Sequence, residues 1–175
     1  MKDSQSRFIS VISTSGGMDS TSLLLRKLKE GKEVYAIGFN YGQRHAIELD
    51  RLKSNLNYLK QKNIVVNYRS VDLRSAFSTL SSALTDTNRD MPEGFYAEEN
   101  MKQTVVPNRN AIFSSIVFGH ALALYEKFTC PVEISLGVHS GDHAIYPDCR
   151  PEFYNSLYQA FQVGNWNGSQ ISLDL

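Results

Sequence analysis

The sequence has little cysteine, no net charge and no long hydrophobic run. Eighteen Lys and Arg residues balance 18 Asp and Glu residues, so the chain lacks the positive field that attracts nucleic acids or anionic membranes without specificity. Its apolar stretches are short, whereas a membrane helix needs about 20 consecutive apolar residues. These absences argue against a nucleic-acid partner and against a membrane protein.

The two cysteines, Cys130 and Cys149, are too few for the disulfide framework of a small secreted protein. The N-terminal residues Met1–Arg7 also lack the apolar core and the small-residue cleavage site of a secretory signal. We therefore predict a cytoplasmic protein with reduced thiols. With 175 residues, of which 42% are hydrophobic, the chain is long enough to bury the core of one domain.

The first half of the sequence alternates between strand and helix patterns. β-Branched segments at Arg7–Thr14, Val34–Phe39 and Ile64–Val71 are typical of strands. Two amphipathic helical patterns separate them, and their apolar positions are Leu23, Leu24 and Leu28 in the first and Ile47, Leu49, Leu52, Leu56 and Leu59 in the second. This order predicts a doubly wound α/β fold, with a mostly parallel sheet and helices on both faces.

The second half predicts a helix over 110–127, a strand over 132–138, a helix over 150–163 and a strand over 171–175. Residues 75–103 show no sustained periodicity, and we interpret them as an active-site cover loop. No linker divides the chain, so we expect residues 1–175 to form a single domain. Because the last alternating segment ends at Leu175, we expect this domain to be cut short at its C-terminus.

The strongest motif is Ser15-Gly16-Gly17-Met18-Asp19-Ser20, between the first strand and the first helix. Two glycines let a ligand approach the backbone, and the N–H groups at a helix N-terminus attract anions. The hydroxyl groups of Ser15, Ser20 and Thr21 add further donors. The alternative is an ordinary capped turn, in which Asp19 or Ser20 serves the first turn of the helix. The sequence has neither the Gly-Lys-Ser/Thr of a Walker A motif nor a Gly-x-Gly-x-x-Gly motif.

Two further motifs follow strands or precede helices, where ligands of open α/β sheets bind. Phe39–His45 ends the second strand; Arg44 suits a phosphate, and His45 suits a phosphate oxygen or a proton transfer. In Val105–Asn110, Asn108 is a candidate helix cap and Arg109 a candidate phosphate ligand. For each motif, a solvated or capped helix end is the alternative interpretation.

A third loop combines Gly137–His143 with Tyr146–Phe153 and follows the predicted strand over 132–138. It concentrates ionisable side chains at the expected ligand edge, namely His139, Asp142, His143, Asp148, Cys149 and Arg150. The sequence leaves the roles of His139, Asp142, His143 and Cys149 open. For Arg150, the alternative to binding a substrate carboxylate is capping of the last helix.

Taken together, the motifs resemble the PP-loop ATP pyrophosphatases, whose fold is adenine nucleotide alpha hydrolase-like. Within them the sequence is most similar to the 7-cyano-7-deazaguanine synthase family, QueC. The strings that carry this resemblance are Ser15–Ser20, Tyr41–His45, Ser82–Thr85, Val106–Asn110 and Tyr146–Phe153. The resemblance implies a ligase that uses ATP, Mg²⁺ and ammonia to convert 7-carboxy-7-deazaguanine to its nitrile, preQ0, in queuosine biosynthesis. It also implies a homodimer.

The resemblance also suggests roles for individual residues. Pyrophosphate binding falls to Ser15, Gly16, Gly17, Met18, Asp19, Ser20 and Thr21, and catalysis to Arg44, Arg109 and Asp19. Substrate binding falls to Tyr41, His45, Tyr146, Asp148 and Arg150.

The family carries a structural zinc in a cysteine-rich C-terminal segment, but two cysteines cannot form that ligand set here, so we expect no metal-ligating residues in this chain. Whether this exact chain is active is therefore open. Two alternatives remain, namely another PP-loop adenylating enzyme that acts on tRNA and a nucleotide-binding remnant without catalysis.

Overall fold

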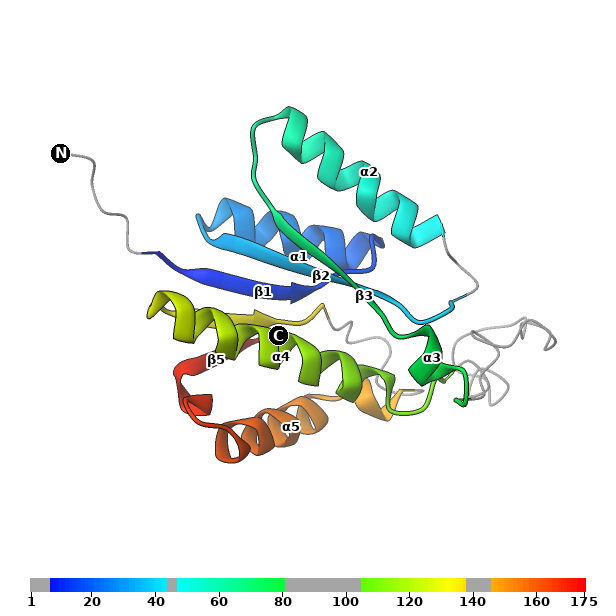
Figure 1. Cartoon of the computed structure of the whole chain (residues 1–175), viewed down its shortest axis with the longest axis vertical. Coiled ribbons are helices and arrows are strands. Elements are labelled where there is room, and N and C mark those ends of the chain that lie inside the picture. The colour runs from blue at the N-terminus through cyan, green and yellow to red at the C-terminus, as the bar shows by residue number, and fades with distance from the viewer. Residues whose placement is uncertain (1–6, 44–46, 81–104, 138–145) are drawn as a thin grey trace.

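The computed structural model describes residues 7–43, 47–80, 105–137 and 146–175. They form a five-stranded sheet in which every strand pair is parallel and the strand order is β3-β2-β1-β4-β5 (Figure 1). The strands are β1 (Ile9–Ser13), β2 (Glu33–Asn40), β3 (Asn67–Asp72), β4 (Val132–Ser135) and β5 (Ile171–Asp174). The prediction of a doubly wound, mostly parallel sheet is confirmed.

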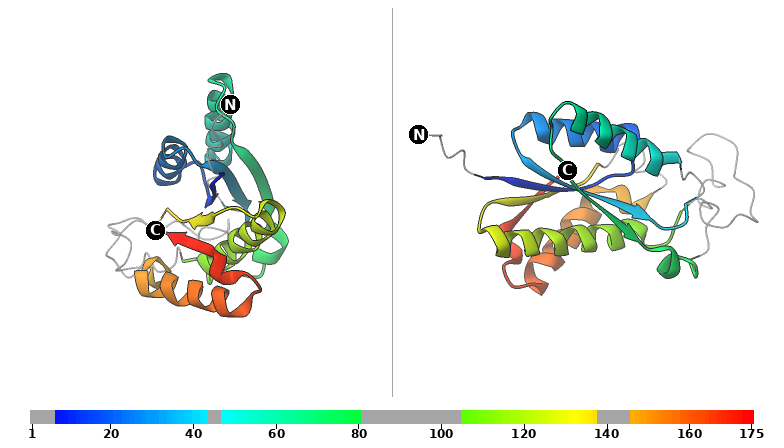
Figure 2. Two further views of the ribbon diagram at one scale, coloured as in Figure 1. Left: turned by 90° about the vertical axis from the view of Figure 1, so that its left-hand side faces the viewer. Right: turned by 45° about the horizontal axis from the view of Figure 1, so that its top comes forward.

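Helices cover both faces of this sheet, as predicted. Helices α1 (Met18–Lys29) and α2 (Ile47–Gln61) lie on one face, and α4 (Arg109–Phe128) and α5 (Pro151–Gly164) lie on the other (Figure 2). The short helix α3 (Arg74–Phe77) follows β3, and the 3₁₀ helices η3 (Pro147–Cys149) and η4 (Gly168–Gln170) flank α5. No helix in the described part of the chain is long and apolar enough to cross a membrane.

Strand β1 is the centre of the fold, because it pairs with β2 on one side and with β4 on the other. Its side chains alternate between two cores. Ile9 and Val11 belong to the core beneath α4, whereas Ile12 belongs to the core beneath α1 and α2. Burial on both faces explains the apolar, β-branched character of this strand. The end of β1 therefore fixes the position of the loop that follows it.

Some predicted boundaries differ from the structure. The third strand begins at Asn67 instead of Ile64, because Asn63 has a left-handed backbone (φ 60°) and the Ile64 N–H donates to the Leu59 carbonyl, 3.0 Å away. Residues 64–66 thus complete the end of α2. The fourth strand ends at Ser135. Helix α3 occupies the start of the expected cover loop, and residues 81–103 of that loop lie outside the described residues.

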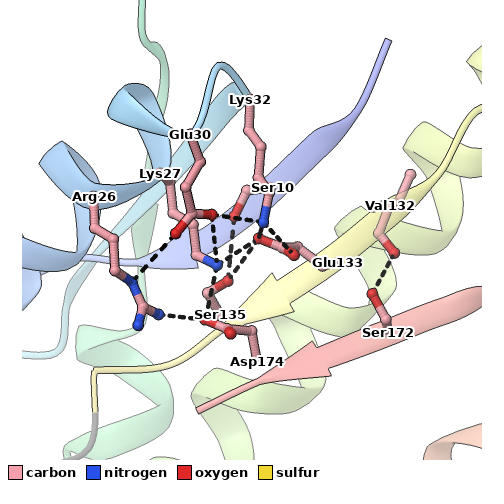
Figure 3. A network of polar contacts seen from close by, with 10 residues as sticks. All are labelled: Ser10, Arg26, Lys27, Glu30, Lys32, Val132, Glu133, Ser135, Ser172 and Asp174. Atoms are coloured by element: carbon pink, nitrogen blue, oxygen red, sulfur yellow. Dashed lines mark hydrogen bonds and ion pairs between the residues drawn. The ribbon is translucent and has the colours of Figure 1, made fainter. Parts of the chain in front are cut away.

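The last strand is paired, because β5 runs parallel to β4 with Leu173 opposite Ile134. A polar network on the α1 side of the sheet holds this edge (Figure 3). The Lys27 ammonium, 1% exposed, lies 2.7 Å from a Glu133 carboxylate oxygen on β4 and 2.7 Å from an Asp174 carboxylate oxygen on β5. Lys32 bonds Glu133 from the other side at 2.8 Å, and Arg26 pairs with Asp174.

Candidate nucleotide site

The loop between β1 and α1 is closed by the Ser20 side chain. Its Oγ accepts hydrogen bonds from the backbone N–H groups of Ser15 (3.3 Å) and Gly16 (3.2 Å), and it donates to the Gly17 carbonyl (3.2 Å). The Ser15 Oγ accepts from the Gly17 N–H at 3.2 Å. The first N–H groups of α1 have no acceptor inside the helix. The result is a preformed turn at the positive end of a helix, which suits a phosphate group.

Gly16 is required by close packing against α2. Its φ is +88°, and a Cβ atom there would lie 2.4 Å from the Glu48 carbonyl oxygen and 2.7 Å from the Leu52 nitrogen. Both are backbone atoms, so no side-chain rotation relieves the contact. Only glycine therefore allows the loop to be supported by α2 in this conformation.

A cavity of about 200 Å³ lies next to this loop at the carboxyl edge of the sheet. Four segments that are distant in the sequence form it: the β1–α1 loop, the start of α4, the end of β4, and the η3–α5 region. Its lining residues are Ser13, Ser15, Asp19, Ser20, Arg109, Asn110, Phe113, Ser114, Leu136, Gly137, Cys149 and Tyr154. Open parallel sheets bind ligands at this edge.

Arg109 and Asn110, at the start of α4, form one wall of the cavity. The Arg109 Nε–H donates to the Asn110 Oδ1 at 3.2 Å. The Asn110 Nδ2 donates to the Asp148 carbonyl at 3.5 Å and approaches the Cys149 Sγ at 3.9 Å. Asn108 does not cap the helix through its side chain, contrary to the expectation, because its backbone is left-handed (φ 57°) and not extended as in a capping residue.

Two buried residues complete this wall. Tyr154 is 6% exposed and Ser114 is 2% exposed, and both line the cavity. Burial raises the pKa of Tyr154, and Cys149 and Asp148 add to this rise, while Arg109 opposes it. The phenol therefore stays protonated at neutral pH and is available as a hydrogen-bond donor.

The structure brings some of the predicted site residues together. Ser15, Asp19, Ser20 and Arg109 all line the cavity, and Gly16 and Gly17 form the loop beside it. Two members of the motif are placed elsewhere: Met18 is 80% exposed, and the Thr21 Oγ1 accepts a hydrogen bond from the Asn55 amide on α2 at 3.3 Å. Part of the turn therefore faces the cavity, and part packs on α2.

The predicted substrate residues are more dispersed. The ring of Tyr41 packs against Phe77 and Phe113, with centroids 5.5 and 5.4 Å apart, and does not line the cavity. Tyr146 and Asp148 lie at η3, and Arg150 occupies the N-cap position of α5 without a capping side-chain bond. The remaining predicted residues, Arg44, His45, His139, Asp142 and His143, lie outside the described residues.

The sequence-based prediction missed Asn110, Ser114 and Tyr154. Asn110 stands beside Arg109 in the Val106–Asn110 motif, and helical spacing puts Ser114 one turn further on the same face. Nothing in the sequence distinguishes Tyr154 from Tyr158, the other tyrosine of α5.

The described residues do not fit a structural zinc ion. They contain no group of three or more His, Cys, Asp and Glu side chains that could hold a metal. Cys130 is buried in the core beneath α4, whereas Cys149 lines the cavity.

Comparison with known protein families identifies the family of this chain. The family model of the queuosine biosynthesis protein QueC matches residues 9–175. The chain belongs to the QueC family. Among curated relatives of the family, 7-cyano-7-deazaguanine synthase 1 from Colwellia psychrerythraea is 42% identical over 162 residues, covering 92% of this chain and 69% of the relative.

Two other relatives bear the name 7-cyano-7-deazaguanine synthase. The protein from Alteromonas mediterranea is 46% identical over 158 residues, covering 89% of this chain and 67% of the relative. The protein from Hahella chejuensis is 43% identical over 158 residues, covering 90% of this chain and 64% of the relative. The chain thus spans about two thirds of the length of these QueC relatives.

Among solved structures, a predicted subunit of tRNA methyltransferase from Methanocaldococcus jannaschii is similar in fold. The TM-score is 0.50 at 14% identity, with 96% of this chain and 66% of that chain covered. At this identity the likeness concerns the fold alone.

Proposed function

We propose that this member of the QueC family is an ATP-dependent ligase that converts 7-carboxy-7-deazaguanine and ammonia to 7-cyano-7-deazaguanine for queuosine biosynthesis. One observation carries the proposal beyond family membership. The turn at Ser15–Ser20 contributes to the same cavity as Arg109, Ser114 and Tyr154. This pairing provides an anion site and a set of donors for the group that reacts with the nucleotide.

The nucleotide binds with its pyrophosphate at the β1–α1 turn. The N–H groups at the start of α1 and the Ser15 hydroxyl face the phosphate oxygens, and the helix dipole favours their charge. Mg²⁺ would offset the phosphate charge, and the Asp19 carboxylate is the oxygen ligand that lines the cavity. Arg109 stabilises the charge that develops as pyrophosphate leaves.

The reaction takes two adenylations. A carboxylate oxygen of the substrate attacks the α-phosphorus of ATP and displaces pyrophosphate; ammonia then attacks the carbonyl carbon, and AMP leaves, so an amide forms. The amide oxygen attacks the α-phosphorus of a second ATP and again displaces pyrophosphate. Loss of AMP and of the protons on nitrogen then leaves the nitrile. Both adenylations need an electrophilic phosphate held next to the same carboxyl-derived oxygen.

The size of the cavity indicates which part of the substrates it holds. At about 200 Å³ it is smaller than the roughly 300–1,000 Å³ of sites that enclose a whole ligand. We infer that it encloses the reacting carboxyl group and the α-phosphate. Tyr154 then donates a hydrogen bond to the carboxyl-derived oxygen, and Ser114 lines the same wall.

The remaining roles follow from the resemblance and are part of the same proposal. Asp148 accepts hydrogen bonds from the N–H edge of the deazaguanine, Tyr146 stacks on the base, and Arg150 meets the carboxylate. Arg44 and His45 assist at the phosphates, and Tyr41 is a second candidate for stacking. We further propose that the enzyme is cytoplasmic and homodimeric.

The test is to incubate the full chain with MgATP, ammonium and 7-carboxy-7-deazaguanine, and to follow AMP by chromatography and the base by mass spectrometry. AMP together with the nitrile supports the proposal. Accumulation of the amide would limit the chain to the first adenylation, and ATP binding without AMP release would overturn the ligase assignment.

Arg109→Ala and Ser20→Ala connect the activity to this cavity. We expect Arg109→Ala to lower kcat by about 100-fold, as loss of a charge-stabilising donor does in other enzymes. Ser20→Ala removes the hydroxyl that closes the turn and should weaken ATP binding in titration calorimetry. Arg51→Ala is the matched control, because Arg51 is exposed on α2 and has no ion pair among the described residues. If all three variants behave alike, the site lies elsewhere.

A further inference from the structure

One side-chain amide joins the two motifs that form one wall of the cavity. The Asn110 Oδ1 accepts a hydrogen bond from the Arg109 Nε–H at 3.2 Å. Its Nδ2 donates to the Asp148 carbonyl at 3.5 Å and approaches the Cys149 Sγ at 3.9 Å. An amide offers an acceptor and two donors on one rigid plane, so Asn110 contacts both neighbours at once.

The contact with Arg109 restrains a side chain that is otherwise free to rotate. Arg109 forms no ion pair with any carboxylate in the described ranges, and its Nε–H bond to Asn110 fixes the plane of the guanidinium. This bond leaves the terminal nitrogens available for a phosphate. Because a guanidinium recognises phosphate through a planar fork, the orientation of that plane determines the contact.

The contact with Asp148 and Cys149 restrains a short turn. Helix η3 has three residues, and its internal bonds run from the Cys149 N–H to the Tyr146 carbonyl at 2.9 Å and from the Arg150 N–H to the Pro147 carbonyl at 3.3 Å. These bonds hold the turn together. The amide of Asn110 links it to the start of α4, although the partners are 38 positions apart in the sequence.

We propose that Asn110 is a positioning residue that sets the Arg109 guanidinium and the Asp148–Cys149 turn at a fixed separation along one wall of the cavity. The inference rests on the proposed ligase function for its kinetic consequences only. Arg109 faces the phosphates and the turn faces the base, so Asn110 aligns the nucleotide with the group to be adenylated. It acts through these neighbours, without a contact to the reacting atoms.

Kinetics of three variants test this role. A misplacement of about 1 Å costs up to about 100-fold in rate, so we expect Asn110→Ala to lower kcat by 10- to 100-fold while the KM for ATP changes less than about threefold. Asn110→Asp keeps the acceptor for Arg109 but sets a carboxylate oxygen against the Asp148 carbonyl, so it should not restore the wild-type kcat. In the Arg109→Ala background, Asn110→Ala should cost little more, because the two residues act as one unit. Additive losses would overturn the proposal.

Thiol chemistry provides a second test that does not depend on activity. Cys149 is partly exposed and Cys130 is buried, so an aromatic disulfide reagent distinguishes them. We expect Asn110→Ala to release the turn and to raise the rate of Cys149 modification at least threefold, with Cys130 as the internal reference. Cys149→Ser assigns the signal, and Asn57→Ala on the exposed face of α2 is the matched control.

The two tests separate the possible failures. If the wild-type chain makes no AMP but Asn110→Ala still raises the reactivity of Cys149, the ligase proposal fails and the positioning role of Asn110 stands. If the wild-type chain is active and Asn110→Ala changes neither kcat nor the rate of Cys149 modification, the positioning role is refuted and the ligase proposal stands. The positioning role is also refuted if Asn110→Ala and Asn57→Ala lose the same thermal stability and show the same kinetics.

Discussion

Lys27 is a buried cation, and its replacement by methionine should destabilise the fold by about 3 kcal/mol. Its side chain is 1% exposed, and its ammonium lies 2.7 Å from both Glu133 and Asp174 (Figure 3). Methionine keeps the length of the apolar stem but removes the charge. The Glu133 carboxylate, with its side chain 7% exposed, then loses one of its two cationic partners.

The magnitude follows from what remains around Glu133. Removing one partner of a buried ion pair usually costs about 3–5 kcal/mol, because an uncompensated charge stays buried. Here Lys32 still bonds Glu133 at 2.8 Å, and Arg26 still pairs with Asp174. We therefore place Lys27→Met at the low end of that range. With a typical urea dependence of about 2 kcal/mol per molar, the unfolding midpoint should fall by about 1.5 M.

Urea unfolding followed by circular dichroism at pH 7 measures this change. Lys29→Met is the matched control, because Lys29 lies in the same last turn of α1, is exposed and forms no ion pair in the described part of the chain. Its cost should stay below about 1 kcal/mol. Equal midpoints for the two variants would refute the view that Lys27 compensates a buried carboxylate.

The pH dependence of stability provides an independent check of the same ion pairs. Burial raises the pKa of Glu133, but the bonds from Lys27 and Lys32 outweigh it, so the pKa in the folded protein lies below its ordinary value of 4.5. A lowered carboxyl pKa stabilises the fold above the unfolded value, and this stability is lost as the pH falls through the folded value. The advantage of the wild type over Lys27→Met should therefore be full at pH 7 and shrink below about pH 4.5. A constant difference down to pH 2.5 would contradict this account.

Two further predictions concern the cavity. Gly16→Ala would place a Cβ atom 2.4 Å from the Glu48 carbonyl oxygen, so the turn must shift; we expect ATP affinity to fall at least tenfold in calorimetry. Gly119→Ala meets no atom within 4 Å, and it should gain about 0.5–1 kcal/mol of stability with unchanged ATP affinity. Tyr154→Phe should lower kcat/KM for 7-carboxy-7-deazaguanine by about 10- to 100-fold, the value of a hydrogen bond to a charged group, whereas Tyr58→Phe on exposed α2 should not change it. Equal kinetics for the two tyrosine variants would exclude a substrate contact at Tyr154.

The parts of the fold that could be predicted from the sequence are those determined by local patterns. The β-branched residues of Arg7–Thr14 predict the strand β1, and the glycines that follow predict a tight turn. The burial of β1 on both faces comes from the structure. The prediction of the third strand was wrong at its start. Ile64 is β-branched and suits a strand, but its N–H donates to the Leu59 carbonyl at the end of α2, and β3 begins at Asn67.

The parts that could not be predicted depend on contacts between distant segments. Asn110 is one polar residue among many until the packing of η3 against α4 places Asp148 beside it. Lys27 is similar, since a lysine in the last turn of a helix is expected in solvent, and only the pairing of β4 with β5 encloses its charge. Residue type and spacing give no signal for such sites, because the partner is fixed by topology.

Helix α1 carries the proposed phosphate-binding turn at its start and Lys27 near its end. Its 12 residues span about 18 Å, so the two functions are separated along one rigid rod. The turn is held by Gly16 against Leu52 of α2, independently of the polar network. Lys27→Met should therefore lower stability while ATP binding to the folded protein stays within about twofold of the wild type, as measured by calorimetry well below the unfolding midpoint. A parallel loss of affinity would show that the network also positions the turn, and that the two ends of α1 move together.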